Sequence, residues 1–152
     1  AGAVRAAEAT GRLLGTWRLV SYVDVDPAGT TSEGPLGPAP VGLLHYLADG
    51  HMAVSMMRTA DGDAAGASGQ HETFMGYAGR WRLDGDRVVH RAEVSAHGFQ
   101  VGVDQVREVV LDGDELTLFG NRPNSDPPQR RMLRWRRVSA GPAGTVGRGD
   151  GS

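Results

Sequence analysis

Apolar and polar residues alternate along most of the chain. Alternation over about four to eight residues predicts a half-buried β-strand, because successive side chains of a strand point to opposite faces. No convincing long helical pattern interrupts these stretches, so the chain is predicted to be all-β with at least eight strands. The predicted strands cover residues 13–25, 42–48, 51–57, 79–83, 87–94, 104–111, 115–119 and 130–138.

Three Asp-Gly pairs stand between consecutive predicted strands. They are Asp49-Gly50, Asp84-Gly85 and Asp112-Gly113. Each pair lies at the spacing of a two-residue hairpin turn, which joins neighbouring antiparallel strands. Parallel strands would need long crossover connections instead. The pattern therefore predicts an antiparallel up-and-down β-barrel.

The remaining segments divide the chain into an arm, a barrel domain and a tail. Residues 1–12 are predicted to form a short N-terminal helix or arm, and residues 13–138 the barrel. Residues 139–152 are rich in Gly and polar side chains and are expected to be disordered. Within the barrel, residues 30–40 carry three prolines and are predicted to form a loop. Residues 70–77 are compatible with a short helix that places Phe74 and Tyr77 on one side.

A Gly-x-Trp sequence opens the first predicted strand. Gly15 permits a tight entry of the backbone, and Trp17 follows where a small barrel closes one end. We predict that Trp17 is a core residue that seals the barrel. An arginine of the last strand stacked on its indole would be structural cation–π packing.

Alternation also assigns side chains to the barrel interior. The strand at 104–111 leaves two alternatives: either Val106 and Glu108 face inward, or Leu111 does and brings Gln105 and Arg107 with it. Elsewhere the arginine run at 130–137 is predicted to lie mostly on a solvated outer face. The residues predicted to face inward on the other strands are Gly79, Trp81, Leu83, Val88, His90, Ala92, Val94, Leu133 and Trp135, with Arg134 and Arg136 outside.

Composition narrows the class of protein. A chain of 152 residues has room for one domain, and a net charge of −2 gives no general attraction for nucleic acid. The absence of cysteine excludes disulfides and thiolate metal sites. No apolar run approaches the roughly 20 residues of a membrane span, and no signal-peptide pattern is present. We expect a cytoplasmic protein that is a monomer or a homodimer.

Metal and nucleophile chemistry find little support in the motifs. The five histidines show no helical pair and no carboxylate at ligand spacing, and no Gly-x-Ser-x-Gly sequence is present. We therefore predict no metal and no cofactor. His45 and His51 flank a hairpin and are near enough to leave a metal site as a minor alternative, as is a haem held by His90. His90 is equally compatible with a buried core histidine that is satisfied by a neighbour.

The motifs together resemble the bacterial lipocalin-like domain family. The likeness covers residues 13–138 and rests on the order and spacing of its segments. They are 14–21 (LGTWRLVS), 40–46 (PVGLLHY) followed by Asp49-Gly50 and Met52, 77–81 (YAGRW), 89–95 (VHRAEVS), 101–107 (VGVDQVR) and 111–118 (LDGDELTL). The Gly- and Ala-rich stretch at 61–69 departs from the family pattern.

This resemblance implies a small barrel with a cavity for a hydrophobic small molecule. Similar small barrels of bacterial polyketide and other natural-product pathways act as cyclases or isomerases, some of them for [4+2] cycloadditions. Such an enzyme folds its substrate into a reactive shape and polarises a carbonyl with hydrogen-bond donors. The residues with that donor chemistry are Arg107, His90 and Gln105.

The expected function is therefore binding of a hydrophobic small molecule, with cofactor-independent cyclisation or isomerisation as the preferred activity. A non-catalytic carrier or sequestering protein is the alternative, because both need an apolar pocket with few polar groups. Nucleic acid and membranes are not expected as partners. The residues predicted to line the ligand cavity are Trp81, Leu83, Tyr46, Met52, Met56, Phe74, Tyr77, Val88, Ala92 and Trp135.

Overall fold

A computed structural model describes residues 2–59, 73–121 and 129–140 of the chain. One helix, α1 (Gly2–Leu13), precedes nine strands and a short 3₁₀ turn, η2 (Gly98–Gln100), so the predicted all-β class and short N-terminal helix are confirmed. The strands are β1 (Gly15–Val25), β2 (Thr31–Glu33), β3 (Val41–Tyr46), β4 (His51–Met57), β5 (Phe74–Asp84), β6 (Arg87–Ser95), β7 (Asp104–Asp112), β8 (Glu115–Asn121) and β9 (Arg130–Ala140).

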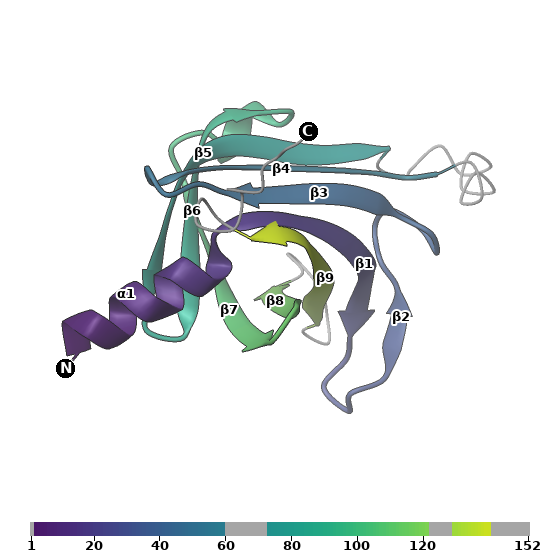
Figure 1. Ribbon diagram of the computed structural model, residues 1–152. Coiled ribbons are helices and arrows are strands. Elements are labelled where there is room, and N and C mark those ends of the chain that lie inside the picture. The colour runs from purple at the N-terminus through teal and green to yellow at the C-terminus, as the bar shows by residue number, and fades with distance from the viewer. Residues whose placement is uncertain (1, 60–72, 122–128, 141–152) are drawn as a thin grey trace, which may run out of the picture.

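The strands form a closed antiparallel barrel (Figure 1). Neighbours in sequence pair with one another from β3 to β9, and β1 closes the ring by pairing with both β3 and β9. β2 pairs only with the far end of β1, at residues 23–25, and lies inside the segment predicted to be a loop. β2 can pair because it ends before the prolines of this segment, which lack the N–H needed for ladder hydrogen bonds.

The three predicted hairpins are present, but the Asp-Gly pairs are not their loops: the loops are residues 47–50, 85–86 and 113–114. Gly50, Gly85 and Gly113 have φ values of 91°, 66° and 61°, which lie in the left-handed region that glycine adopts without strain. These turns connect β3 to β4, β5 to β6 and β7 to β8. The up-and-down order of the barrel follows from them.

The helix expected near residue 74 is absent. Residues 74–77 begin β5 and pair with β4, with Phe74 opposite Met57 and Tyr77 opposite Val54; residues 70–72 lie outside the described part of the chain. Backbone hydrogen bonds to β4 satisfy this segment better than one isolated helical turn would. Strand alternation then places Phe74 on the outer wall, where it is 44% exposed, and Tyr77 on the inner wall.

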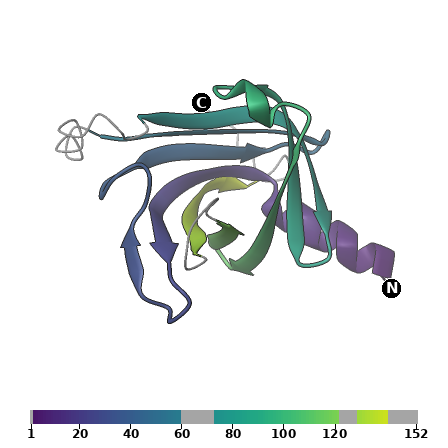
Figure 2. The same ribbon diagram turned by 180° about the vertical axis from the view of Figure 1, so that it is seen from behind.

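One end of the barrel is sealed around Trp17. Its indole is 0% exposed and donates a hydrogen bond from Nε1 to the Leu13 carbonyl oxygen at 3.0 Å. The Arg137 guanidinium lies 4.2 Å from the centre of the Trp17 ring and donates to the Leu14 carbonyl oxygen. α1 extends from this end beside the β5–β6 hairpin (Figure 2). The predicted burial of Trp17 and the arginine stacked on it are both confirmed.

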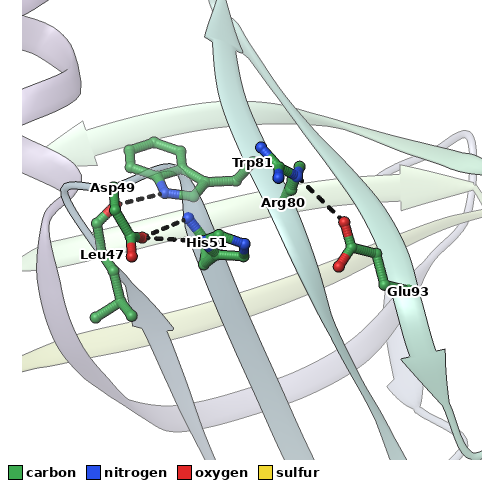
Figure 3. A network of polar contacts seen from close by, with 6 residues as sticks. All are labelled: Leu47, Asp49, His51, Arg80, Trp81 and Glu93. Atoms are coloured by element: carbon green, nitrogen blue, oxygen red, sulfur yellow. Dashed lines mark hydrogen bonds and ion pairs between the residues drawn. The ribbon is translucent and has the colours of Figure 1, made fainter.

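A second tryptophan fixes the β3–β4 hairpin. Trp81 donates from its ring Nε1 to the Leu47 carbonyl oxygen at 3.0 Å (Figure 3). Its backbone N donates to the Gly50 carbonyl oxygen at 2.9 Å. In the same turn, the Asp49 carboxylate accepts hydrogen bonds from His51. Because Tyr46 directly precedes this turn, its ring is held at 4.5 Å from the Trp81 ring.

Two register shifts change which residues face inward. Between Leu19 and Ser21 the pairing of β1 with β9 shifts by one residue, so that Tyr22 and Asp24 follow Leu19 into the interior. A second shift on β5 and β6 leaves Val94, which was predicted to face inward, 68% exposed. An extra residue in one strand reverses the alternation beyond it. Simple alternation therefore fails at these two points. A third shift, between Thr16 and Trp17, skips Val138 in the pairing of β1 with β9.

Candidate functional site

A buried histidine joins two tyrosines inside the barrel. His90 on β6 is 3% exposed, and its Nε2 lies 2.6 Å from the hydroxyl of Tyr46 on β3. Its Nδ1 lies 2.7 Å from the hydroxyl of Tyr77 on β5. Both ring nitrogens are therefore engaged by tyrosine side chains from different strands.

This histidine is neutral under ordinary conditions. Burial, followed by the positive charge of Arg107, lowers the pKa of His90 to about 3. Burial also raises the pKa of Tyr46 and of Tyr77, so both phenols keep their protons. A neutral imidazole has one N–H and one acceptor nitrogen, so one tyrosine donates to the ring and the other accepts from it.

The structure selects the second alternative for the strand at 104–111. Gln105, Arg107 and Leu111 lie on the inner, partly buried face of β7, whereas Val106 and Glu108 are exposed. Glu108 pairs outside with Arg130, at 2.7 Å between the Arg130 Nη2 and the Glu108 Oε1. Arg107 and Gln105 thus belong to the same interior as His90.

Arg107 has space because the facing position on β8 is a glycine. A Cβ atom at Gly120 would lie 3.1 Å from the Arg107 Nε, so a larger residue would press on the guanidinium. Arg107 donates to the Gln105 side-chain Oε1 at 3.4 Å and to the Val106 carbonyl oxygen at 3.2 Å. Its charge also lowers the pKa of His90 and opposes the rise in the pKa of Tyr77.

A second polar group in the interior escaped the sequence prediction. Asp24 is buried, and its Oδ1 lies 3.4 Å from the Arg131 Nε; Arg131 also donates to the Tyr22 hydroxyl at 3.3 Å. The bulge in β1 hid the inward direction of Tyr22 and Asp24. Arg131 and Arg137 were assigned to the outer face with their neighbours, and for these two the assignment is wrong. The sequence signal for this group was the spacing of Tyr22 and Asp24, because residues two apart on a strand share one face.

Most of the predicted lining residues share the inner wall. Phe74 is the exception, since it stands on the outer wall. Tyr77 and Leu83 are only partly buried although they point inward, as are the inner residues of β7. Solvent therefore reaches this part of the interior. The inner wall carries Tyr46, Met52, Met56, Tyr77, Trp81, Leu83, Val88, Ala92 and Trp135.

Two pockets open on the outer surface of the barrel. One, of about 220 Å³, is formed by Gly50, Arg80, Trp81, Arg82, Val89 and Arg91. The other, of about 240 Å³, is formed by Arg18, Val41, Gly42, Leu43, Ser55, Met56, Met57 and Phe74. Outward-facing residues supply most of both linings. Neither pocket contains the histidine or the two tyrosines bonded to it.

The histidines that flank the β3–β4 hairpin have separate partners. The His45 Nδ1 lies 3.1 Å from the Thr16 Oγ1, and the His51 Nδ1 lies 3.1 Å from the Asp49 Oδ1. Over residues 2–59, 73–121 and 129–140, no group of three or more His, Asp or Glu side chains could hold a metal ion. His71 falls outside the described residues.

A closed antiparallel barrel with an apolar interior and a few buried polar groups is the architecture of small-molecule-binding barrels. The family model of the lipocalin-like domain matches residues 14–138, and the chain belongs to that family. No curated protein and no solved structure matches the chain significantly. Membership of this family suggests binding of a hydrophobic ligand. Among the described residues, no helix is long and apolar enough to cross a membrane.

Proposed function

We propose that this protein binds an apolar small molecule inside the barrel and catalyses its cofactor-independent cyclisation or isomerisation, for example a [4+2] cycloaddition in polyketide or other natural-product biosynthesis. The observation that carries the proposal is the hydrogen-bonded set of Tyr46, His90 and Tyr77, with Arg107 nearby, inside an otherwise apolar wall. Barrel cores need no such group for packing. An apolar ligand with one hydrogen-bond acceptor would match this polar group inside an apolar wall.

The apolar wall would supply orientation. Met52, Met56 and Val88 are buried on the inner face, and methionine adapts to irregular shapes. A flexible polyene held against this wall would adopt a folded, near-attack conformation, which contributes much of the rate enhancement in such reactions. In a [4+2] closure three π bonds of the substrate are converted into two new carbon–carbon σ bonds and one new π bond, so nothing is released. No external reactant is therefore needed.

The polar cluster would supply electrostatic stabilisation. Tyr77 and Arg107 are donors on the partly exposed inner wall, so they are placed to polarise a substrate carbonyl as charge develops on its oxygen. Both nitrogens of His90 are occupied by tyrosines, so His90 acts here as a positioning residue. Gln105 positions Arg107 through its side-chain oxygen. These roles refine the donor roles predicted for His90 and Gln105.

Binding is tested with the neutral lipophilic fluorophore N-phenyl-naphthylamine. We expect saturable probe fluorescence with energy transfer from tryptophan, weakened by Ala92→Phe or Val109→Phe on the inner wall. Phe74→Ala on the outer wall is the matched control, and it should leave the probe affinity unchanged. Circular dichroism and melting confirm that each variant folds. Loss of binding in Phe74→Ala alone would place the ligand in the outer pocket and refute an interior site.

Catalysis is tested by single-turnover conversion of a linear polyene that carries a conjugated carbonyl. Removing one donor, by Arg107→Met or Tyr77→Phe, should slow turnover by roughly 10- to 1000-fold without abolishing it. Parent-like rates in both variants would refute their catalytic role. A parent that binds the polyene and gives no rate above the uncatalysed background would be a carrier. The cytoplasmic location and the monomeric or homodimeric state stay predictions.

A further inference from the structure

The two tyrosines bonded to His90 differ in what their protons can reach. Tyr46 is 1% exposed, and among the described residues its hydroxyl has one hydrogen-bond partner, the His90 Nε2. A buried hydroxyl proton without an acceptor is costly. Tyr46 therefore donates to Nε2. Because His90 is neutral, its hydrogen then lies on Nδ1, and Nδ1 donates to the Tyr77 oxygen.

This order leaves the Tyr77 proton without a partner. The Tyr77 oxygen accepts from His90, and its hydroxyl proton has no acceptor among the described residues. Tyr77 as a residue is only partly buried on the inner wall, so of the two tyrosines it is the one that a ligand could approach. Tyr77 is thus a donor aimed at the interior.

Arg107 differs from the other two interior arginines in its partners. Arg131 lies 3.4 Å from the Asp24 carboxylate, and Arg137 lies 3.3 Å from that of Asp114. Arg107 bonds to two neutral oxygens, those of Gln105 and Val106, and to no carboxylate within the described ranges. Its positive charge is therefore uncompensated by a neighbouring anion there.

The interior holds further hydrogen-bond donors. The Trp135 Nε1 is buried and has no hydrogen-bond partner among the described residues. Gln105 uses its side-chain oxygen for Arg107, which leaves its amide N–H groups as donors. Tyr77, Arg107, Gln105 and Trp135 thus offer N–H or O–H groups. An ammonium ligand would be repelled by the positive charge of Arg107.

We propose that the ligand carries an acidic oxygen headgroup, a carboxylate or the enolate of a β-dicarbonyl, that binds between Arg107 and Tyr77. This inference rests on the proposed interior binding site. A delocalised oxygen anion offers two acceptors, so it can take the guanidinium and the phenol together. Hydrogen bonds with an ionised partner are roughly twice as strong as neutral ones. The apolar remainder of the ligand lies along the methionine-lined wall.

The headgroup is tested by displacing N-phenyl-naphthylamine with compounds of equal chain length: dodecanoate, dodecanol, dodecylamine and a β-diketone with a dodecyl chain. We expect dodecanoate, the enolised diketone or both to bind at least about tenfold more tightly than dodecanol, and dodecylamine to bind most weakly. The comparison of dodecanoate with the diketone distinguishes a carboxylate from an enolate. Equal affinities for both acids and dodecanol would overturn the inference.

Variants identify the residues responsible. Arg107→Met should remove the preference for the acidic headgroup over dodecanol, and Tyr77→Phe should reduce that preference severalfold. Arg134→Met, on the outer wall beside Glu115, is the matched control and should change nothing. A preference that survives Arg107→Met would overturn the assignment. If the probe itself does not bind, the proposed function fails; binding without headgroup preference refutes the inference alone.

Which ring nitrogen of His90 carries the hydrogen can be measured directly. Heteronuclear NMR of the His90 ring nitrogens should show a protonated Nδ1 and an unprotonated Nε2. In Tyr46→Phe the Nε2 signal should shift, because its donor is gone. The opposite tautomer in the parent would mean that Tyr77 donates to His90, and it would refute Tyr77 as a ligand donor.

Discussion

The sealed end around Trp17 and the barrel interior around His90 differ in whether their polar groups have hydrogen-bond partners. At the sealed end, the Trp17 indole donates to Leu13, and Arg137 donates to backbone carbonyls and stacks on the indole. In the interior, the Trp135 indole has no acceptor, and Arg107 has no carboxylate among the described residues. The donors at the sealed end are therefore satisfied within the protein, whereas the interior has donors that a ligand could use.

This difference separates structural from functional residues. A buried donor without an acceptor costs about 1–3 kcal/mol, so such a group is not retained for stability. The sealed end contributes stability through burial of a large ring and satisfied hydrogen bonds. In the interior, the unsatisfied donors lower the stability of the fold, and they stay available for hydrogen bonds to a ligand. Substitutions at the sealed end should therefore mainly lower stability, whereas substitutions in the interior should mainly change ligand binding.

The largest effect is expected at the sealed end. Trp17→Ala should lower the free energy of unfolding by about 3–5 kcal/mol, because it removes a fully buried ring and leaves a cavity. The melting temperature should fall by roughly 10 °C. Val20→Ala, on the exposed outer face of β1, is the control and should stay within about 0.5 kcal/mol. A Trp17→Ala protein that melts within about a degree or two of the parent would contradict a plug.

A pH titration of stability tests the buried histidine. The pKa of His90 is about 3 in the folded protein and near 6.5 in the unfolded chain, so acid protonates the unfolded state first. His90 therefore stabilises the fold fully above about pH 6.5, and this contribution declines down to about pH 3. By pH 5 the loss should reach about 2 kcal/mol.

Chemical denaturation of the parent and His90→Gln across this pH range isolates the effect. Carboxylates titrate in both proteins, so the difference between their unfolding free energies reports the histidine. That difference should change with pH as described. A difference that is constant from pH 7 to about pH 4 would show that His90 is protonated in the fold or open to solvent.

The smallest effects should separate the two tyrosines. Tyr46→Phe leaves the buried Nε2 of His90 without its donor and should cost about 1–2 kcal/mol of unfolding free energy. Tyr77→Phe changes a residue that is only partly buried, where a water molecule can take the place of the hydroxyl, and it should cost about 0.5 kcal/mol. Equal costs in thermal or chemical unfolding would remove the distinction between a structural and a ligand-facing hydroxyl.

Local patterns in the sequence determined the architecture. Alternating residues predicted the barrel strands, the Asp-Gly pairs predicted the hairpins, and Gly15 with Trp17 predicted the sealed end. These features depend on neighbours within a few residues, because strand alternation and turn geometry are local properties. His90 was found by the same means, as a polar residue on an otherwise apolar face, whereas alternation left open whether Gln105 and Arg107 face inward.

Only the tertiary structure decided which of these faces meet and where alternation breaks. The bulge in β1 brought Tyr22 and Asp24 inside, the shift beside Gly79 sent Val94 outside, and pairing with β4 made residues 74–77 a strand. The bonds of His90 join residues 44 and 13 positions away in the chain. Register and contact between distant strands come from cross-strand pairing and closure of the barrel, which no local pattern contains.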